Sequence, residues 1–302
     1  MRRSNSSLEN ATVPRLPSDI EDLAREAFMV EAAPRLVREV ARTLAAHGIP
    51  VMPLKGVLLQ RLVYGDGVFR RISDVDILVP SSCFSEAHTA LLRAGFRNVF
   101  WEKGRWQATL ENPSGIPLGI DLHRNISRTP RSRLTPDRMF ERSSGDEGLF
   151  GVAVRIPSPY DLFAHVLLHG MLHWLMLGQV HRPRDFSAIA ARFSLDEEGC
   201  AEYVADLGLA THALAFLPMT LKAVESPFIR GLLAKVHHRA DLRGRLTAAA
   251  ILNVLSNPQT GRISRRLAGL ALAPSLPGAI KAGIVDRGRS TFYDFLDRHI
   301  AG

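Results

Sequence analysis

Apolar positions recur at two different spacings along the chain, and the change between them divides it into two parts. Residues 18–47 carry apolar side chains every three or four positions, which is typical of an amphipathic helix. Residues 49–123 hold short apolar or alternating segments between Gly, Pro and Asn, a pattern typical of strands and turns. After residue 157 the helical spacing returns and persists. The pattern predicts strands and helices together at first, followed by helices alone.

These segments predict individual elements. Strands are expected over 49–54, 74–79, 96–101, 105–110, 118–123 and 151–157. The third and fourth of them form a hairpin across Glu102-Lys103-Gly104. Helices are expected over 18–47, 57–63, 82–94 and 136–140. A long helix opens at Ser158-Pro159, because Ser is a favourable cap and Pro suits the first helical position. The polar, arginine-rich segment 124–150 is expected to be a mobile connection or lid.

Length and composition limit the class of protein. The chain has 302 residues, enough for two modest domains, and we expect a boundary near residue 157. Residues 1–17 are expected to be a disordered arm, because no apolar segment follows the basic start as a signal peptide requires. No uncharged apolar run reaches 18 residues, and two cysteines are too few for a disulfide framework. The cytoplasm is therefore the expected compartment.

The formal net charge is +8, and it is unevenly distributed. Residues 230–302 contain 12 Lys and Arg against 4 Asp and Glu, whereas residues 1–229 contain 26 of each sign. The basic excess is therefore confined to the C-terminal quarter. It favours an acidic partner, such as nucleotide phosphates, a nucleic acid, an acidic peptide or an anionic lipid surface. The other interpretation is the solvated surface of an Arg-rich helical domain.

Two carboxylates at the start of a predicted strand give the clearest chemical signal. Residues two apart on a strand point to the same face, so Asp74 and Asp76 project together. Two close carboxylates repel each other unless a cation or a proton lies between them. Upstream, the turn at Lys55-Gly56 feeds a helix whose free amide groups favour an anion. Paired carboxylates beside such a turn indicate metal-assisted phosphoryl chemistry.

Four segments carry a resemblance to a known family: Leu54-Lys55-Gly56, Arg70, Asp74-Val75-Asp76-Ile77-Leu78-Val79 and Ile120-Asp121-Leu122-His123. They resemble the uncharacterised nucleotidyltransferase family, which belongs to the DNA polymerase beta-like nucleotidyltransferase superfamily. The resemblance implies an α+β fold: a mixed sheet with flanking helices, followed by an all-helical domain. Residues 18–157 would form the catalytic domain, and residues 158–302 the helical domain with the basic C-terminal quarter. The Gly-Ser usual in the superfamily is absent, and Lys55-Gly56 stands in its place.

The resemblance also implies site residues. Asp74, Asp76 and Asp121 would be catalytic and would hold one or two Mg²⁺ or Mn²⁺ ions, with Asp121 as the best candidate for the general base. The nucleoside triphosphate would be bound by Lys55, Gly56, Arg70, Ser73, His169 and Asp185. His123 shares a strand face with Asp121, and would either touch the substrate or orient Asp121.

A second cluster lies on the first helix after residue 157. His165, His169 and His173 fall four residues apart, on one helical face. Three interpretations stay open. The histidines line a cleft and contact nucleotide, or they pack in the interior, or two of them bind zinc together with His181 or Asp185. The Glu of the His-Glu-x-x-His motif is missing.

These features predict a Mg-dependent nucleotidyltransferase. It would move an NMP or phosphoryl group from an NTP to a hydroxyl or phosphate acceptor on a small molecule, sugar or biosynthetic peptide. One alternative is a tRNA nucleotidyltransferase or toxin-like enzyme of the same superfamily, which would use the basic quarter to grip nucleic acid. Another is a metal-dependent hydrolase built on the three histidines. The last is a non-catalytic module that senses nucleotide.

Overall fold

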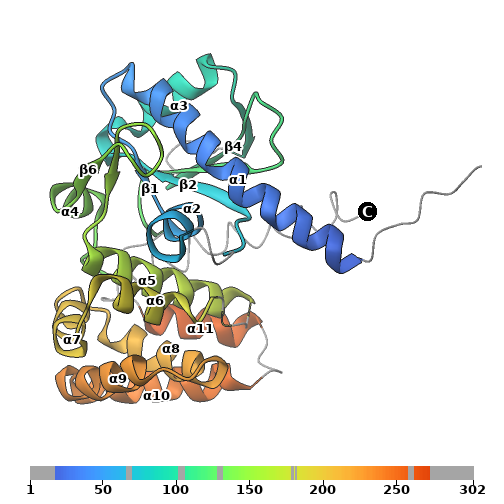
Figure 1. Ribbon diagram of the computed structural model, residues 1–302. Coiled ribbons are helices and arrows are strands. Elements are labelled where there is room, and N and C mark those ends of the chain that lie inside the picture. The colour runs from blue at the N-terminus through green and yellow to red at the C-terminus, as the bar shows by residue number, and fades with distance from the viewer. Residues whose placement is uncertain are drawn as a thin grey trace, which may run out of the picture.

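In a computed structural model, the chain folds around a five-stranded mixed sheet with a helical part below it (Figure 1). The structure describes residues 18–65, 70–100, 106–127, 132–177, 180, 182–257 and 262–272. The strand order is β1-β2-β5-β4-β3. The pair β2–β5 is parallel, and the other neighbours in this sheet are antiparallel. The expected α+β fold, a mixed sheet followed by helices, is confirmed.

The first part of the chain alternates helices and short strands. Its elements are α1 (Ser18–Ala45), β1 (Met52–Pro53), α2 (Lys55–Leu59), a π-helical turn (Gln60–Tyr64), β2 (Asp74–Leu78), a 3-10 turn (Ser81–Cys83), α3 (Phe84–Arg93), β3 (Arg97–Phe100), β4 (Gln107–Glu111), β5 (Gly119–His123), α4 (Pro136–Glu141), β6 (Ser144–Asp146) and β7 (Val154–Ile156). Strands β3 and β4 form the expected antiparallel hairpin. The hairpin turn at residues 102–104 and the arm at residues 1–17 lie outside the described residues.

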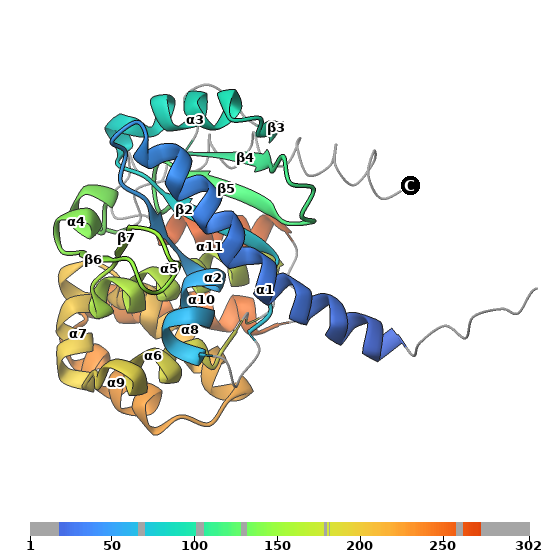
Figure 2. The ribbon, with the colours of Figure 1, turned by 45° about the horizontal axis from the view of Figure 1, so that its top comes forward.

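The two faces of the central strands differ in chemistry. Val75 and Ile77 of β2 and Ile120 and Leu122 of β5 are fully buried in the apolar core. Helices α1 and α3 lie on one side of the sheet, and α2 and the helical part lie on the other (Figures 1 and 2). Because side chains alternate along a strand, the carboxylates of β2 and β5 share the opposite face from these apolar residues. That polar face is turned toward α2 and α5.

Two residues, 157 and 158, separate the end of β7 from the helical part. It consists of α5 (Pro159–Leu177), α6 (Asp185–Phe193), α7 (Glu197–Asp206), α8 (Ala210–Ala223), α9 (Pro227–Arg239), α10 (Leu242–Ser256) and α11 (Arg262–Ala271). The hydroxyl of Ser158 accepts a hydrogen bond from the Asp161 amide at 3.2 Å, which caps α5 as the sequence predicts. Helix α5 packs against α6, α8 and α11 and lies nearest the sheet (Figure 1).

Three local elements differ from the sequence expectation. The first strand covers only Met52–Pro53, and the helix after it begins at Lys55 and continues as a π-helical turn. The segment expected to be a mobile connection contains, besides the expected helix α4, the unexpected strand β6, which pairs with β7. The polar sequence of β6 shows no apolar alternation. Its register is supported by Arg155, whose Nη2 donates to the Ser143 carbonyl at 2.5 Å. Residues 128–131 of that segment lie outside the described part.

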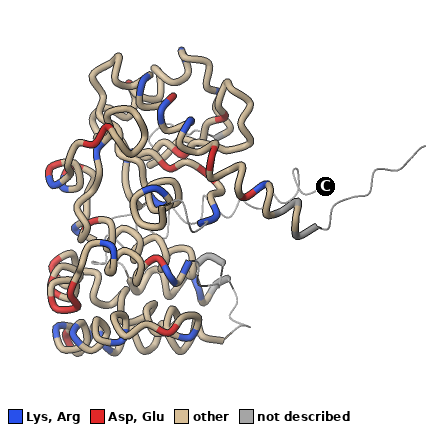
Figure 3. Tube along the Cα trace, viewed as in Figure 1, with Lys and Arg blue, Asp and Glu red and all other residues tan. Residues whose placement is uncertain are grey.

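Part of the basic excess is neutralised locally. In Figure 3, Lys and Arg residues along α9 lie close to acidic residues of α7. Lys235 and Arg239 both form ion pairs with Glu198, and Arg230 pairs with Glu225 at 3.8 Å. These contacts show that some cations of the C-terminal quarter have partners within the fold. None of the described helices is both long and apolar enough to cross a membrane.

Candidate active site

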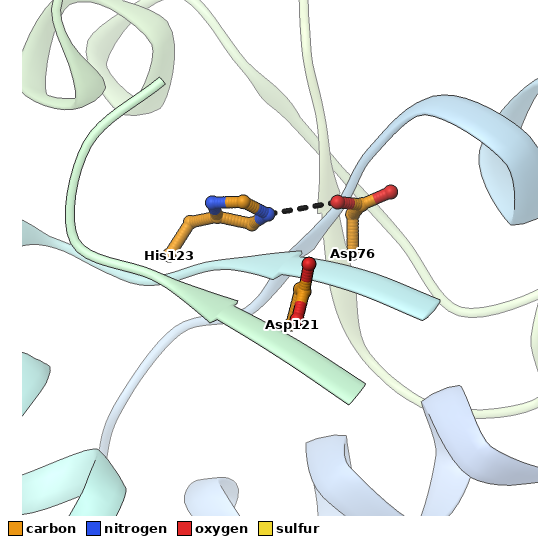
Figure 4. Close-up of side chains that lie close together, drawn as sticks. All are labelled: Asp76, Asp121 and His123. Atoms are coloured by element: carbon orange, nitrogen blue, oxygen red, sulfur yellow. Dashed lines mark hydrogen bonds and ion pairs between the residues drawn. The ribbon is translucent and has the colours of Figure 1, made fainter. Parts of the chain in front are cut away.

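The parallel register of β2 and β5 places two carboxylates side by side. Asp76 lies opposite Asp121, and His123 lies two residues further along β5 on the same face. One ligand atom from each of these three side chains lies within 4.8 Å of the others (Figure 4). His123 Nε2 is 2.8 Å from Asp76 Oδ1. His123, expected either to touch the substrate or to orient Asp121, contacts Asp76 directly.

Strand β4 orients the Asp121 carboxylate. Thr109 lies opposite Asp121 in the antiparallel β4–β5 register, and its hydroxyl donates to Asp121 Oδ1 at 2.7 Å. Gln107, two residues away on the same face of β4, donates from Nε2 to Asp121 Oδ2 at 3.3 Å. Each carboxylate oxygen therefore has one donor. These bonds fix the direction in which Asp121 can present its lone pairs to a ligand.

Lys55 is held over Asp76 by the backbone. Leu54 donates its amide to the Asp76 carbonyl at 2.9 Å, which ties the start of α2 to β2. Lys55, in the expected turn at Lys55-Gly56, has a φ of 47°, in the left-handed region that glycine usually occupies. Its Nζ atom lies 2.5 Å from Asp76 Oδ1, and the Asp76 side chain is 2% exposed. The backbone thus places the ammonium directly on the carboxylate site.

The charges of this group shift one another's ionisation. Although burial opposes ionisation, the Lys55 ammonium and the His123 hydrogen bond hold the pKa of Asp76 well below its usual range. Asp74 lies on the same face, and the Asp76 carboxylate and burial raise the pKa of Asp74 to about 6. Burial lowers the pKa of Lys55, but Asp76, Asp74 and Asp121 together raise it above its ordinary value. Lys55 is thus electrostatically coupled to all three carboxylates.

A second ion pair joins the sheet part to α6. Arg70 donates from Nη2 to Asp185 Oδ2 at 2.8 Å and from Nε to Asp185 Oδ1 at 3.1 Å. The Tyr64 hydroxyl donates to the same Oδ1 at 2.7 Å. A Cβ atom at Gly56 would come within 3.0 Å of Arg70 Nη1, so glycine is what allows the guanidinium to lie against the turn. Arg70 therefore lies beside the Lys55–Gly56 turn while paired with Asp185.

The sequence model of a family described as "Uncharacterised nucleotidyltransferase" matches residues 6–222, which is more than half of the chain. The chain belongs to this family. The match includes every residue of the carboxylate group, the Lys55–Gly56 turn and the Arg70–Asp185 pair. Membership makes the protein a nucleotidyltransferase, and so a transferase, as the sequence predicts.

Comparisons with individual proteins are more distant. No curated protein matches the chain. Two solved structures of the antibiotic-resistance factor ANT(2'')-Ia are similar to it. The solution structure has 13% identity, covers 59% of this chain and 91% of the other, and has a TM-score of 0.43. The crystal structure with adenylyl-2''-tobramycin has 14% identity, covers 57% and 94%, and has a TM-score of 0.41.

In this nucleotidyltransferase, His165 and His169 of α5 are electrostatically coupled to Lys55 and Asp76 of the carboxylate site. His165 is 1% exposed, and neither ring nitrogen has a hydrogen-bond partner among the described residues. Burial and then the Lys55 charge lower the pKa of His165 to about 3, and burial and Lys55 lower that of His169 as well. The ring centroids of His165 and His169 are 6.5 Å apart. The electrostatic coupling to Lys55 and Asp76 favours the interpretation that these histidines line the site.

The described residues form no zinc site on α5. No three His, Cys, Asp or Glu side chains that include an α5 histidine lie close enough to share an ion in the described part. Asp185, one proposed fourth ligand, is engaged by Arg70 and Tyr64. His181, the other, lies outside the described residues.

Several site residues were not predicted from the sequence. Thr109 and Gln107 alternate within a predicted strand, so their shared polar face was a signal that could have been read. Tyr64 carries no such signal, because its partner Asp185 lies 121 positions away along the chain. Gln60, whose side-chain oxygen accepts a hydrogen bond from the Arg70 amide at 2.6 Å, lies in a π-helical turn that no apolar spacing predicts. Ser73, expected to bind nucleotide, donates its hydroxyl to Asp74 Oδ1 at 3.0 Å.

Proposed function

We propose that this nucleotidyltransferase transfers an NMP group from an NTP to a hydroxyl or phosphate acceptor on a small molecule, a sugar or a biosynthetic peptide, with Mg²⁺ or Mn²⁺ as cofactor. The observation that carries the proposal is the cross-strand pair of Asp76 and Asp121, with ligand atoms within 4.8 Å of each other and of His123. Two carboxylates this close repel each other unless a cation lies between them, which supports a site built for a cation.

The donor set fits a hard divalent ion. Carboxylate oxygens are the ligands that Mg²⁺ and Mn²⁺ prefer, and no thiolate lies in the group. Asp74, Asp76 and Asp121 would hold the ion, and the Asp76 carboxylate stays ionised at neutral pH, as a ligand must. When bound, the metal would neutralise charge on the phosphates and on the leaving pyrophosphate.

The residues of the chain supply positioning and proton transfer. The acceptor oxygen attacks the α-phosphorus in line, the bond from that phosphorus to the bridging oxygen breaks, and pyrophosphate leaves. Asp121 takes the proton of the acceptor hydroxyl, with Thr109 and Gln107 holding its oxygens in place. His123 holds Asp76 through its 2.8 Å hydrogen bond. General-base catalysis of this kind contributes about 10²- to 10⁴-fold in rate.

The nucleotide phosphates are bound at the start of α2. Lys55, the amide of Gly56 and the Arg70 guanidinium lie together there, and Asp185 keeps Arg70 directed toward the turn. Ser73 stands at the start of β2 beside Asp74 and extends the polar rim. His169, on the α5 face across the site, would contact the nucleotide from the helical side. With this assignment, residues of both the sheet part and α5 would contact the nucleotide.

The transfer is tested by incubating the full-length protein and Mg²⁺ with NTPs labelled at either the α- or the γ-phosphate, and with sugar, peptide, small-molecule and RNA acceptors. Transfer of the α-label with release of pyrophosphate is the expected result. Transfer of the γ-label instead would identify a phosphoryl transferase. Asp76→Asn and Asp121→Asn should each lower turnover about 10²-fold or more while the fold is kept.

Two further outcomes identify the alternatives. Nucleotide that binds without any transfer or pyrophosphate release, with every acceptor, would mean a nucleotide-sensing module. Labelled RNA as the sole product, with a steep salt dependence of RNA binding, would mean a nucleic-acid enzyme that uses the basic C-terminal quarter. Turnover of the Asp76→Asn variant at the wild-type rate would overturn the metal assignment.

A further inference from the structure

Lys55 occupies the electrostatic centre of the carboxylate site. Its Nζ atom lies 2.5 Å from Asp76 Oδ1, the same oxygen that His123 Nε2 contacts at 2.8 Å. The side chains of Lys55 and Asp76 are 16% and 2% exposed, so water screens this pair weakly. In addition to Asp76, the charges of Asp74 and Asp121 raise the pKa of Lys55. One ammonium group therefore serves as the counter-charge of three carboxylates.

The chain has a lysine at a position whose backbone conformation is better suited to glycine. Lys55 has a φ of 47°, which for any residue other than glycine costs about 1–2 kcal/mol. The hydrogen bond from the Leu54 amide to the Asp76 carbonyl holds the backbone there, at 2.9 Å. The side chain beyond it is a four-carbon stem that can rotate. The ammonium is therefore delivered to Asp76 by a fixed backbone and can leave it by rotation of the side chain alone.

A divalent cation and the ammonium compete for the same carboxylate group, Asp76. A magnesium ion approaches its carboxylate ligands to about 2.0–2.1 Å, which is closer than the ammonium needs to be. Two cations on one buried carboxylate repel each other strongly at this distance. Binding of a metal therefore requires that Lys55 release Asp76. The ammonium then needs another anion, and the phosphates proposed to bind at the start of α2 are the anions within reach of its stem.

We infer that Lys55 is an exchangeable counter-ion: it neutralises the carboxylates of the free enzyme, and moves to the triphosphate when metal and nucleotide enter together. The inference rests on the proposed function and adds that the binding of metal and the binding of nucleotide depend on each other. Metal alone must displace Lys55 without giving the ammonium a new partner, so it binds weakly. Metal and nucleotide together provide that partner, so each strengthens the binding of the other by the same factor.

The test measures Mn²⁺ binding to the full-length protein in the absence of nucleotide, by electron paramagnetic resonance of the free ion. Lys55→Met removes the charge at similar side-chain length, and Lys55→Gly removes it while relieving the left-handed backbone, which protects against loss of the fold. Both variants should bind Mn²⁺ roughly tenfold more tightly than wild type, which is within the usual range for coupled sites. Added Mn²⁺ should also raise their thermal midpoint more than that of wild type.

The same variants are then titrated with a nucleotide whose α,β-bridge is a methylene group and cannot be cleaved. Wild type should show Mn²⁺ and analogue strengthening each other's binding, and the Lys55 variants should lose most of this coupling and bind the analogue more weakly. One substitution would thus act in opposite directions on metal and on nucleotide. Folded Lys55 variants that bind Mn²⁺ no more tightly than wild type would overturn the exchange and leave the proposed function standing.

Asp76→Asn separates the two ideas. It should abolish the Mn²⁺ binding of wild type and of the Lys55→Met variant alike, because the ion depends on that carboxylate. If Asp76→Asn leaves Mn²⁺ affinity unchanged in both backgrounds, the ion is bound elsewhere. That result would overturn the metal site of the proposed function, and the exchange with it. Arg142→Lys, which changes a cation paired with Asp161 away from the carboxylates, should leave Mn²⁺ affinity as in wild type.

Discussion

At the carboxylate face, the negative charge of Asp74 lowers the stability of the folded protein. The Asp76 carboxylate and burial both disfavour the charged form of Asp74, and together they raise its pKa to about 6. The folded-state pKa lies above that of the unfolded chain, so the folded protein holds this proton over a pH range in which the unfolded chain has lost it. Protonated Asp74 therefore contributes stability that is complete below about pH 4. This contribution is lost as the pH rises through about 6 and Asp74 becomes charged.

Asp74→Asn should therefore raise the free energy of unfolding at pH 8 by on the order of 2 kcal/mol, in a buffer containing chelator, and have little effect at pH 4. Urea unfolding at several pH values measures this difference. Glu141→Gln changes an exposed carboxyl and is the matched control, expected to shift stability little at either pH. A destabilising effect of Asp74→Asn at pH 8 would contradict the repulsion deduced from the strand register.

His165 gives a second prediction at this scale. It is buried, and neither ring nitrogen has a hydrogen-bond partner among the residues that the structure describes; each buried polar atom without a partner costs about 1–3 kcal/mol. His165→Leu removes both atoms at similar volume, so the free energy of unfolding should rise by about 1 kcal/mol or more. Asn112→Leu is the control: its side chain makes hydrogen bonds to Ile116 and Leu118, so the same kind of change should destabilise. Equal losses in the two variants would contradict this account.

At the scale of elements, sequence patterns predict what depends on burial and miss what depends on backbone geometry. The strand carrying Asp74 and Asp76 was predictable because Val75, Ile77 and Val79 are apolar and the alternate positions 74 and 76 are acidic. The position of the left-handed turn residue was not. Glycine is the residue that favours positive φ, yet Lys55 adopts it, because a tertiary hydrogen bond from Leu54 to Asp76 sets the backbone there. Gly56 is needed for a different reason, the close approach of Arg70.

Gly56→Ala tests that reason at the start of α2. Alanine is about 1 kcal/mol better than glycine within a helix, so helix propensity alone favours the change. The new Cβ atom, however, would lie 3.0 Å from Arg70 Nη1 and would push the guanidinium away from the turn. We expect little net change in stability and a loss of nucleotide affinity of about tenfold, similar to that of Arg70→Ala. Calorimetric titration with a non-cleavable nucleotide measures it. Gly148→Ala, where a Cβ meets no atom within 4 Å, should bind nucleotide as wild type does.

At the scale of the whole molecule, the relation between the two parts of the chain was the least predictable feature. Helical spacing identifies the helices after residue 157, but no periodicity states which of them faces the sheet. The link made by Arg70 and Asp185 joins residues 115 positions apart and depends on α6 beginning at Asp185 itself. A resemblance to a family indicated both residues, because a family pattern records spatial neighbours that local spacing does not. The boundary at residue 157 stays a prediction, between β7 and α5.

The Arg70–Asp185 pair should therefore be a main energetic link between the sheet part and α6. Both side chains are largely buried, so removing one partner leaves an uncompensated charge, at a cost of roughly 3–5 kcal/mol. Arg70→Met and Asp185→Leu should each destabilise by about this amount. The double variant should lose much less than the sum, because neither charge is left behind. The exposed pair of Arg97 and Glu111 is the matched control, with losses of about 1 kcal/mol or less. Additive losses for Arg70 and Asp185 in urea unfolding would mean that the pair has no coupling energy of its own, and would contradict its role as a link between the sheet part and α6.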